Sequence, residues 1–141
     1  MPTGAEPEAG TFQVLDGSAV VALLLDDGPD GRWVDERVAE ADLVAPHLMP
    51  FESANIIRRT AARGAIDDTQ GFQALSVLFR LDIDLVPLAS VGGRVWELRQ
   101  NLTVYDASYV AVAERLGARL VTLDARLAAA PGIGCEVVAA P

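Results

Sequence analysis

Short apolar runs bounded by polar or turn residues recur along the chain, and they predict buried strands. The runs are FQVLD (12–16), LVAP (43–46), IDLVPL (83–88), RLVTL (119–123) and CEVVA (135–139). None alternates cleanly between apolar and polar residues, and several are rich in β-branched residues. This pattern is typical of strands that are covered on both faces, as in a parallel sheet.

Between these runs, apolar residues recur at three- and four-residue spacing, which predicts amphipathic helices. A first helix begins near Ser18, and a turn follows at DGPDG (27–31). Asp67 is expected to cap the fourth helix, Gly92 and Gly93 to weaken the fifth, and Gly117 to stop the sixth. The later predicted helices cover 32–42, 50–64, 67–80, 90–101, 106–116 and 125–131.

Strands that alternate with helices predict an α/β fold, a sandwich around a central, mainly parallel sheet of about five strands. Two helices separate consecutive strands at 49–80 and at 90–116, which distinguishes the chain from a simple doubly wound fold. Residues 12–141 are expected to form a single domain, preceded by a flexible acidic tail at 1–11.

Composition restricts the classes of protein and site. The chain has 141 residues, of which 51% are hydrophobic, so we expect it to fold. No apolar run approaches the roughly 18 residues of a membrane helix, and the N-terminus does not resemble a secretory signal. The expected location is therefore the cytoplasm. Cys135 is the sole cysteine and His47 the sole histidine, which excludes an intramolecular disulfide, cysteine-rich zinc sites and zinc sites built from paired histidines.

The charge balance argues against general binding of nucleic acid. The net charge is −9, and all eleven basic residues are arginines. Such a chain binds polyanions poorly unless it has a local arginine patch or bound cations.

Acidic residues lie where strands are expected to end. Between Asp106 and Asp124 a helix advances roughly 14 Å and the following strand returns about 16 Å, so both acids finish at the same end. Asp16 ends the first strand, and Glu52 lies in the first turn of the helix after the second strand. Because parallel strands end at one edge, four elements bring these carboxylates together.

Clustered acids repel one another, and hard divalent cations relieve this repulsion. Carboxylate oxygens without thiols suit Mg²⁺ or Mn²⁺, which can drive phosphodiester cleavage and let an acidic pocket accept phosphate. Each acid also has a simpler interpretation: Asp16 and Asp124 as helix N-caps, Asp106 as a first-turn acid, and Glu52 as a solvated helix residue.

Other residues are candidates for supporting roles. Ser18 is expected to cap the first helix and to reach a metal-bound water, whereas Thr122 fits a strand residue. Arg59 and Arg63 follow Glu52 near one helix face, together with Asn55, and either contact RNA phosphates or a partner's acids or form a solvated face. We expect His47 to be a surface or structural residue, and we expect Cys135 to pack as a small apolar side chain.

Three blocks resemble motifs of PIN-domain proteins, above all the VapC toxins of bacterial toxin–antitoxin pairs. The blocks are VLDGSAVVALLLDD, APHLMPFESANIIRR and NLTVYDASYVAVAERLGARLVTLDARLA, and the resemblance covers 12–138. It implies a magnesium- or manganese-dependent endoribonuclease that cuts structured RNA such as tRNA or rRNA. The metal-binding acids of the family fall on Asp16, Glu52, Asp106 and Asp124, with Asn101 and Thr122 as weaker neighbours.

The resemblance also implies partners. VapC toxins form homodimers, and a cognate VapB-like antitoxin inhibits them in a heterotetramer or larger complex. The antitoxin occupies an apolar groove among the early helices, and the apolar surfaces of Phe72 and Trp33 are consistent with such contacts. One residue departs from the family: Gly17 stands where alanine, serine or threonine is more common, which is expected to loosen the first loop.

Two other classes of protein do not fit, haloacid-dehalogenase-type phosphatases and the receiver domains of signalling pairs. VLDGS is similar to the first motif of haloacid-dehalogenase-type phosphatases, but Val14 occupies the place of their nucleophilic aspartate. These phosphatases and receiver domains both need a lysine, and the chain has none. The remaining alternative is a PIN-like binding or regulatory module without catalysis.

Overall fold

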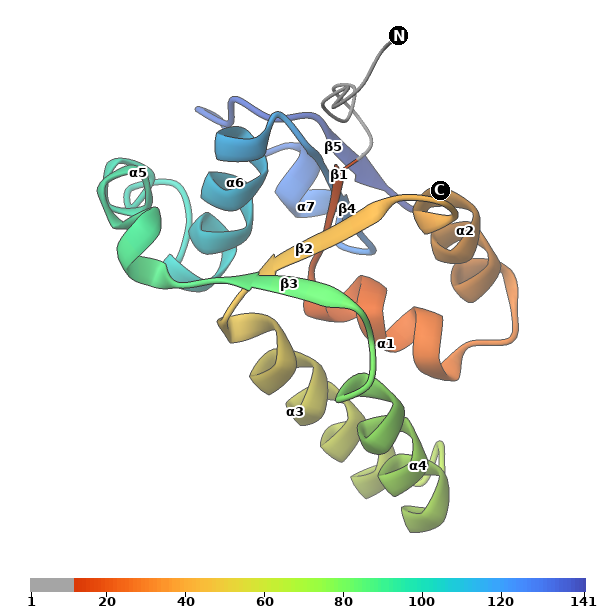
Figure 1. Cartoon of the computed structure of the whole chain (residues 1–141). Coiled ribbons are helices and arrows are strands. Elements are labelled where there is room, and N and C mark those ends of the chain that lie inside the picture. Colours follow the sequence, from red (N-terminus) through yellow and green to blue (C-terminus); the bar gives the residue numbers. More distant parts are fainter. Residues whose placement is uncertain (1–11) are drawn as a thin grey trace, which may run out of the picture.

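A five-stranded sheet forms the centre of the computed structural model, which describes residues 12–141 (Figure 1). The predicted acidic tail lies outside the described residues. The sheet has the order β3-β2-β1-β4-β5, and every pair of neighbours is parallel, although the sequence predicted only a mainly parallel sheet. The strands are β1 (Phe12–Leu15), β2 (Asp42–Pro46), β3 (Ile83–Val86), β4 (Arg119–Thr122) and β5 (Val137–Ala139).

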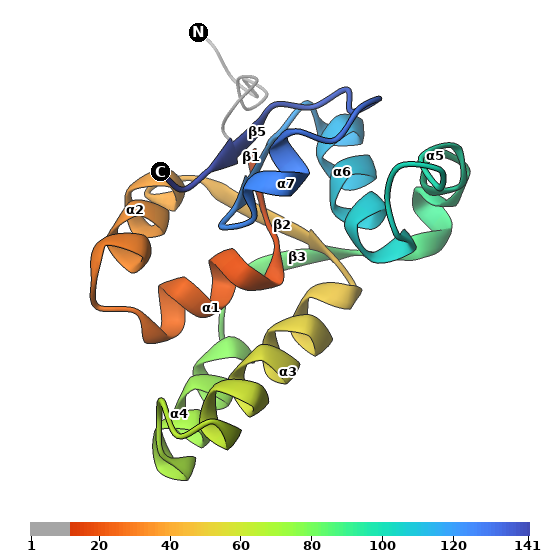
Figure 2. The ribbon, with the colours of Figure 1, turned by 180° about the vertical axis from the view of Figure 1, so that it is seen from behind.

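Helices cover the sheet and extend beyond it. α3 and α4 lie side by side and project away from the strands in both views (Figures 1 and 2). Across residues 12–141, none of the helices combines the length and the apolar character that a membrane crossing needs. The helices are α1 (Gly17–Leu25), α2 (Pro29–Val38), α3 (Leu48–Ala62), α4 (Asp68–Leu78), the 3₁₀ turn η1 (Leu88–Ser90), α5 (Gly92–Glu97), α6 (Val104–Leu116) and α7 (Ala125–Ala128).

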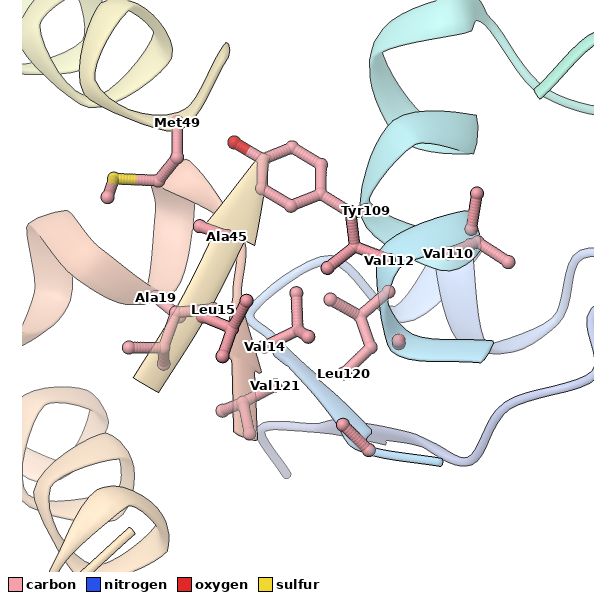
Figure 3. Packing of buried hydrophobic residues seen from close by; sticks show 14 of the residues in the cluster. Val14, Leu15, Ala19, Ala45, Met49, Tyr109, Val110, Val112, Leu120 and Val121 are labelled. Carbon is pink, nitrogen blue, oxygen red and sulfur yellow. The ribbon is translucent and has the colours of Figure 1, made fainter. Parts of the chain in front are cut away.

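The main core lies where β1 and β4 pass between α1 and α6. Figure 3 shows Val14 and Leu120 between Ala19 of α1 and Val112 of α6, and all four side chains are fully buried. Val14 pairs with Leu120 in register, so the core is continuous across the two strands. This packing fixes the carboxyl ends of β1 and β4 next to each other.

The ends of several predicted elements were wrong. α2 begins at Pro29, inside the predicted turn, because proline suits the first helical position, and it ends at Val38 rather than 42 because Glu40 has a left-handed backbone (φ 61°). α5 covers only 92–97 of the predicted 90–101. α6 begins at Val104, two residues early, because Thr103 caps it by accepting the N–H of Asp106.

Two strands and the last helix are shorter than predicted. β3 ends at Val86 rather than at 88, because Pro87 has no N–H to donate to the sheet. β5 covers 137–139 rather than 135–139, and α7 ends at Ala128 rather than at 131. The capping of α4 by Asp67 is confirmed, and Gln70 completes a capping box there.

Leu120→Ala tests the core between β1 and β4. Because Leu120 is fully buried, the change should lower the free energy of unfolding by about 2–5 kcal/mol. The matched change Leu88→Ala removes a side chain that is 51% exposed and should cost less than about 1 kcal/mol. Urea unfolding measures both, and equal losses would contradict the described core.

Candidate active site

Asp16 lies directly after β1 and is almost completely buried, with 7% of the residue exposed. Its Oδ1 accepts the N–H of Ala19 at 3.0 Å and the hydroxyl of Ser18 at 2.6 Å, so Asp16 is the N-cap of α1. Its Oδ2 accepts the hydroxyl of Thr122, at the end of β4. The cap interpretation is therefore correct, and the same contacts fix the orientation of the carboxylate.

Glu52 reaches the same edge from α3. Its Oε1 accepts the backbone N–H of Gly17 at 2.9 Å and the hydroxyl of Tyr109 at 3.1 Å. Within residues 12–141, no hydrogen-bond donor is assigned to Oε2. Glu52 is thus half-buried and anchored at one oxygen, rather than a solvated helix residue.

Asp106 and Asp124 complete the predicted set. Asp106 is the third residue of α6, and its carboxylate receives no hydrogen bond from the described residues. Asp124 is the N-cap of α7, and Arg126 binds it through the backbone N–H at 3.0 Å, Nε at 3.1 Å and Nη2 at 3.0 Å. The N–H of Asp124 donates to Thr122 Oγ1 at 2.9 Å, so Thr122 connects Asp16 with Asp124.

Burial and mutual repulsion control the acidity of the group. Burial raises the pKa of Asp16, and Asp106 raises it further, whereas hydrogen bonds from Ser18, Thr122 and Ala19 oppose the shift. Burial also raises the pKa of Glu52, to which Asp16 and Asp106 add repulsion. The acids therefore interact across elements that are far apart in the sequence.

The other side of the group is partly neutralised. Burial raises the pKa of Asp106 most, followed by repulsion from Asp124. Arg126 instead lowers the pKa of Asp124 through their hydrogen bonds. Burial and the nearby Glu52 raise the pKa of the Tyr109 hydroxyl, so it stays protonated and donates. Asp124 is thus paired with a cation, whereas the ionised forms of Asp16, Glu52 and Asp106 are destabilised by burial and repulsion.

As arranged, no three His, Cys, Asp or Glu side chains in the described part of the chain form a group that could hold a metal ion. The donor chemistry nevertheless fits a hard divalent cation, because Asp106 and Oε2 of Glu52 are carboxylate oxygens without a hydrogen-bond donor among residues 12–141. A cation that binds all four acids would compete with Arg126 for the oxygens of Asp124. The acids therefore fit a divalent cation in two respects: their oxygens are hard ligands, and some of these oxygens have no hydrogen-bond donor among the described residues.

The other predicted residues lie in different places. Contrary to the prediction, Ser18 is not the cap of the first helix, because Asp16 is the N-cap and Ser18 lies inside α1. It is at the site, where its hydroxyl also accepts the N–H of Leu123 at 3.1 Å. Asn101 instead donates to the carbonyl of Pro131 at 3.4 Å and contacts none of the four acids. Arg59 and Arg63 line an open groove between α1 and α3, which Ser18 also lines.

The sole histidine and the sole cysteine lie where the sequence predicted them. His47 is exposed, before α3, where it lines an apolar pocket with Phe51 and Tyr105. Cys135 is partly buried, and burial raises the pKa of its thiol to about 11. A thiol with such a pKa is not activated as a nucleophile.

Three site residues were missed from the sequence. Tyr109 was interpreted only as a core residue, although it follows Asp106 at the three-residue spacing that shares a helix face. Gly17 was noted only as a departure, and no local pattern shows that Glu52 binds its N–H. Arg126 was not singled out, although a basic residue two positions after Asp124 is a visible signal.

Comparison with known proteins gives the family. The family model of the PIN domain matches residues 14–133, which is most of the chain. The chain belongs to the PIN-domain family.

Relatives of this PIN domain carry ribonuclease names. "VapC ribonuclease Mb0985" of Mycobacterium bovis is 39% identical over 128 residues, which are 91% of this chain and 98% of the relative. "Ribonuclease VapC1" of Mycobacterium tuberculosis is 37% identical over 125 residues, covering 88% and 94%. The solved structure of PAE2754 from Pyrobaculum aerophilum superposes with a TM-score of 0.64 at 26% identity, covering 97% of this chain and 91% of that one. The expected fold is therefore confirmed.

The pKa shifts predict a stability effect at Asp106 of this PIN domain. Since its pKa is raised, ionisation opposes folding, and that cost grows as the pH rises from the ordinary value of 3.8. Asp106→Asn should raise the Tm of the metal-free protein by roughly 2–4 °C at neutral pH, an effect limited by solvent screening. The gain should shrink on acidification in a pH series with EDTA.

The comparison variant is Glu114→Gln, for which the expected change in Tm has the opposite sign. Arg94 lowers the pKa of Glu114, so this group contributes stability above its ordinary value of 4.5 and loses it as the pH falls through the lowered pKa. Glu114→Gln should therefore lower the Tm at neutral pH. An Asp106→Asn variant that is also less stable there would contradict the described electrostatics.

Proposed function

We propose that this protein is a metal-dependent endoribonuclease toxin of the VapC type that hydrolyses RNA phosphodiesters. The observation that supports the proposal is the interaction among acids from separate elements of a PIN-domain sheet: Asp16 and Asp106 raise the pKa of Glu52, and Asp124 raises the pKa of Asp106. The ribonuclease names of the relatives support the same activity. In the proposal, these four residues are the catalytic acids and hold Mg²⁺ or Mn²⁺.

The residues of the chain provide the orientation that such a reaction needs. When bound, the divalent ion supplies activation of water and stabilisation of the leaving oxygen. Ser18 and Thr122 hold Asp16 in one orientation, and Glu52 is anchored by Oε1. Asp106 keeps both of its oxygens for the site, and Arg126 restrains Asp124 until an ion competes for it.

RNA recognition needs positive charge in an acidic chain. Arg59 and Arg63 line the groove between α1 and α3, which reaches the active site at Ser18 and Leu123. We propose that these arginines contact either RNA phosphates or acidic residues of an antitoxin. Structured RNA such as tRNA or rRNA is the proposed substrate class.

Partners and location belong to the same proposal. Apolar side chains of Val21, Leu25 and Ile56 form part of the α1–α3 groove, which supports docking of a VapB-like antitoxin segment. Phe51 is 77% exposed and Tyr105 62% exposed beside the pocket that His47 lines, which supports a homodimer and a heterotetramer or larger complex with antitoxin. The proposed location is the cytoplasm.

The second candidate is a PIN-like binding or regulatory module without catalysis. The ion pair between Arg126 and Asp124 favours it, because it neutralises one acid without a metal. The half-buried Glu52 and Asp106, however, have oxygens without a hydrogen-bond donor among residues 12–141, which a purely structural network would not need.

A cleavage assay separates the two candidates. Protein freed of antitoxin should cut RNA with Mg²⁺ or Mn²⁺ and stop with EDTA, and Asp106→Asn should lower the rate by at least about 100-fold because a metal-binding acid is lost. Asp84→Asn, at an exposed residue of β3, is the matched control and should leave the rate unchanged. Full cleavage by Asp106→Asn, or in EDTA, would reject the mechanism.

The same proteins give a binding readout without substrate. Mn²⁺ should raise the Tm of the wild-type protein, because it binds the folded state, and should have little effect on Asp16→Asn. A wild type that does not respond to Mn²⁺ would favour the non-catalytic module.

A further inference from the structure

Gly17 and Glu52 approach so closely that a side chain at residue 17 would collide with Glu52. A Cβ built on Gly17 would lie 2.5 Å from Oε1 of Glu52 and 2.8 Å from its Cγ. Gly17 does not have the left-handed backbone of Gly64 and Gly117, so it is not needed for its φ angle. Its missing side chain instead makes space for the Glu52 carboxylate.

Two donors from different helices meet at one oxygen of Glu52. The N–H of Gly17 is in the first turn of α1, where it has no partner within the helix, and it donates to Oε1 at 2.9 Å. The hydroxyl of Tyr109 donates to the same oxygen at 3.1 Å. The positive end of α1 adds a favourable electrostatic contribution.

Tyr109 is suited to a fixed role. Only 1% of the residue is exposed, and its ring projects from α6 toward Met49 at the start of α3, with the hydroxyl oxygen at the tip (Figure 3). A ring packed in this way cannot turn its hydroxyl to another partner without repacking the core. Glu52 therefore receives one donor from rigid backbone and one from a rigid side chain.

We propose that Gly17 and Tyr109 are positioning residues that hold Glu52 by Oε1 so that Oε2 faces the cation of the active site. This inference rests on the proposed function, because it assigns a role toward the metal. It also replaces the expectation that glycine loosens the first loop: the glycine lets Glu52 close onto the backbone of α1.

A double-mutant cycle on the metal-free, full-length chain tests the contact itself. Alanine favours a helix more than glycine does, so Gly17→Ala should stabilise the chain wherever nothing obstructs the new methyl group. In the wild type it should instead lower the Tm, because the methyl group displaces Glu52. In a Glu52→Ala background the obstruction is gone, and Gly17→Ala should raise the Tm or leave it unchanged.

The affinity for Mn²⁺ tests the positioning role. Mn²⁺ affinity, measured by calorimetry, should fall about 10- to 100-fold in Gly17→Ala and in Tyr109→Phe, as is usual when a residue that orients a ligand is removed. Tyr109→Phe keeps the ring and loses only the hydroxyl, so it gives a second test if Gly17→Ala folds poorly. The matched control is Gly93→Ala, at a helical glycine with open space around its missing side chain, and it should keep the wild-type affinity.

The outcomes separate this inference from the proposed function. The positioning role is supported if Gly17→Ala lowers the Tm of the wild type but not that of Glu52→Ala, and if Gly17→Ala and Tyr109→Phe both bind Mn²⁺ more weakly. Wild-type affinity in both variants overturns the positioning role, even if the Tm cycle shows coupling, and leaves the proposed nuclease in place. A wild-type protein that binds no Mn²⁺ rejects the metal-dependent nuclease, and the positioning role is overturned with it.

Discussion

Repulsion among partly buried carboxylates at the carboxyl edge of the sheet is the constraint to which the rest of the site responds. The parallel order of the strands places Asp16 and Asp124 at that edge, and α3 and α6 bring Glu52 and Asp106 to it. Burial and neighbouring acids raise the pKa of Asp16, Glu52 and Asp106. Without compensation, such a group would oppose folding at neutral pH.

The fold compensates with fixed donors and leaves part of the acidic group unpaired. Thr122 serves both Asp16 and Asp124, so β4 connects two acids that come from different segments. Arg126 neutralises Asp124, whereas Asp106 has no donor among the described residues. In the proposed function, the unpaired oxygens bind a divalent cation, and the repulsion that lowers stability in the metal-free protein contributes to metal affinity.

Sequence reasoning predicted the strands, most helices and the position of Asp16 and Asp124 after the ends of β1 and β4, because these follow from local periodicity and from parallel strand order. The cation-binding role of the four acids stays a prediction. It could not reach the contact between Gly17 and Glu52, since that contact depends on how closely α3 approaches α1. Tyr109 was hidden for a related reason: a tyrosine on an apolar helix face resembles core until its hydroxyl partner is known. The helix predicted at 90–101 was too long: a 3₁₀ turn ends at Ser90, and α5 begins only at Gly92 and ends at Glu97, with Leu98 as its C-cap.

The most direct test of the central claim is to locate Mn²⁺ by anomalous diffraction in crystals of the wild-type protein. The account predicts a peak that contacts carboxylate oxygens from at least three of Asp16, Glu52, Asp106 and Asp124, with Oε1 of Glu52 still bound to Gly17. Saturating Mn²⁺ that leaves this edge of the sheet without a peak, or that binds only elsewhere, would contradict it.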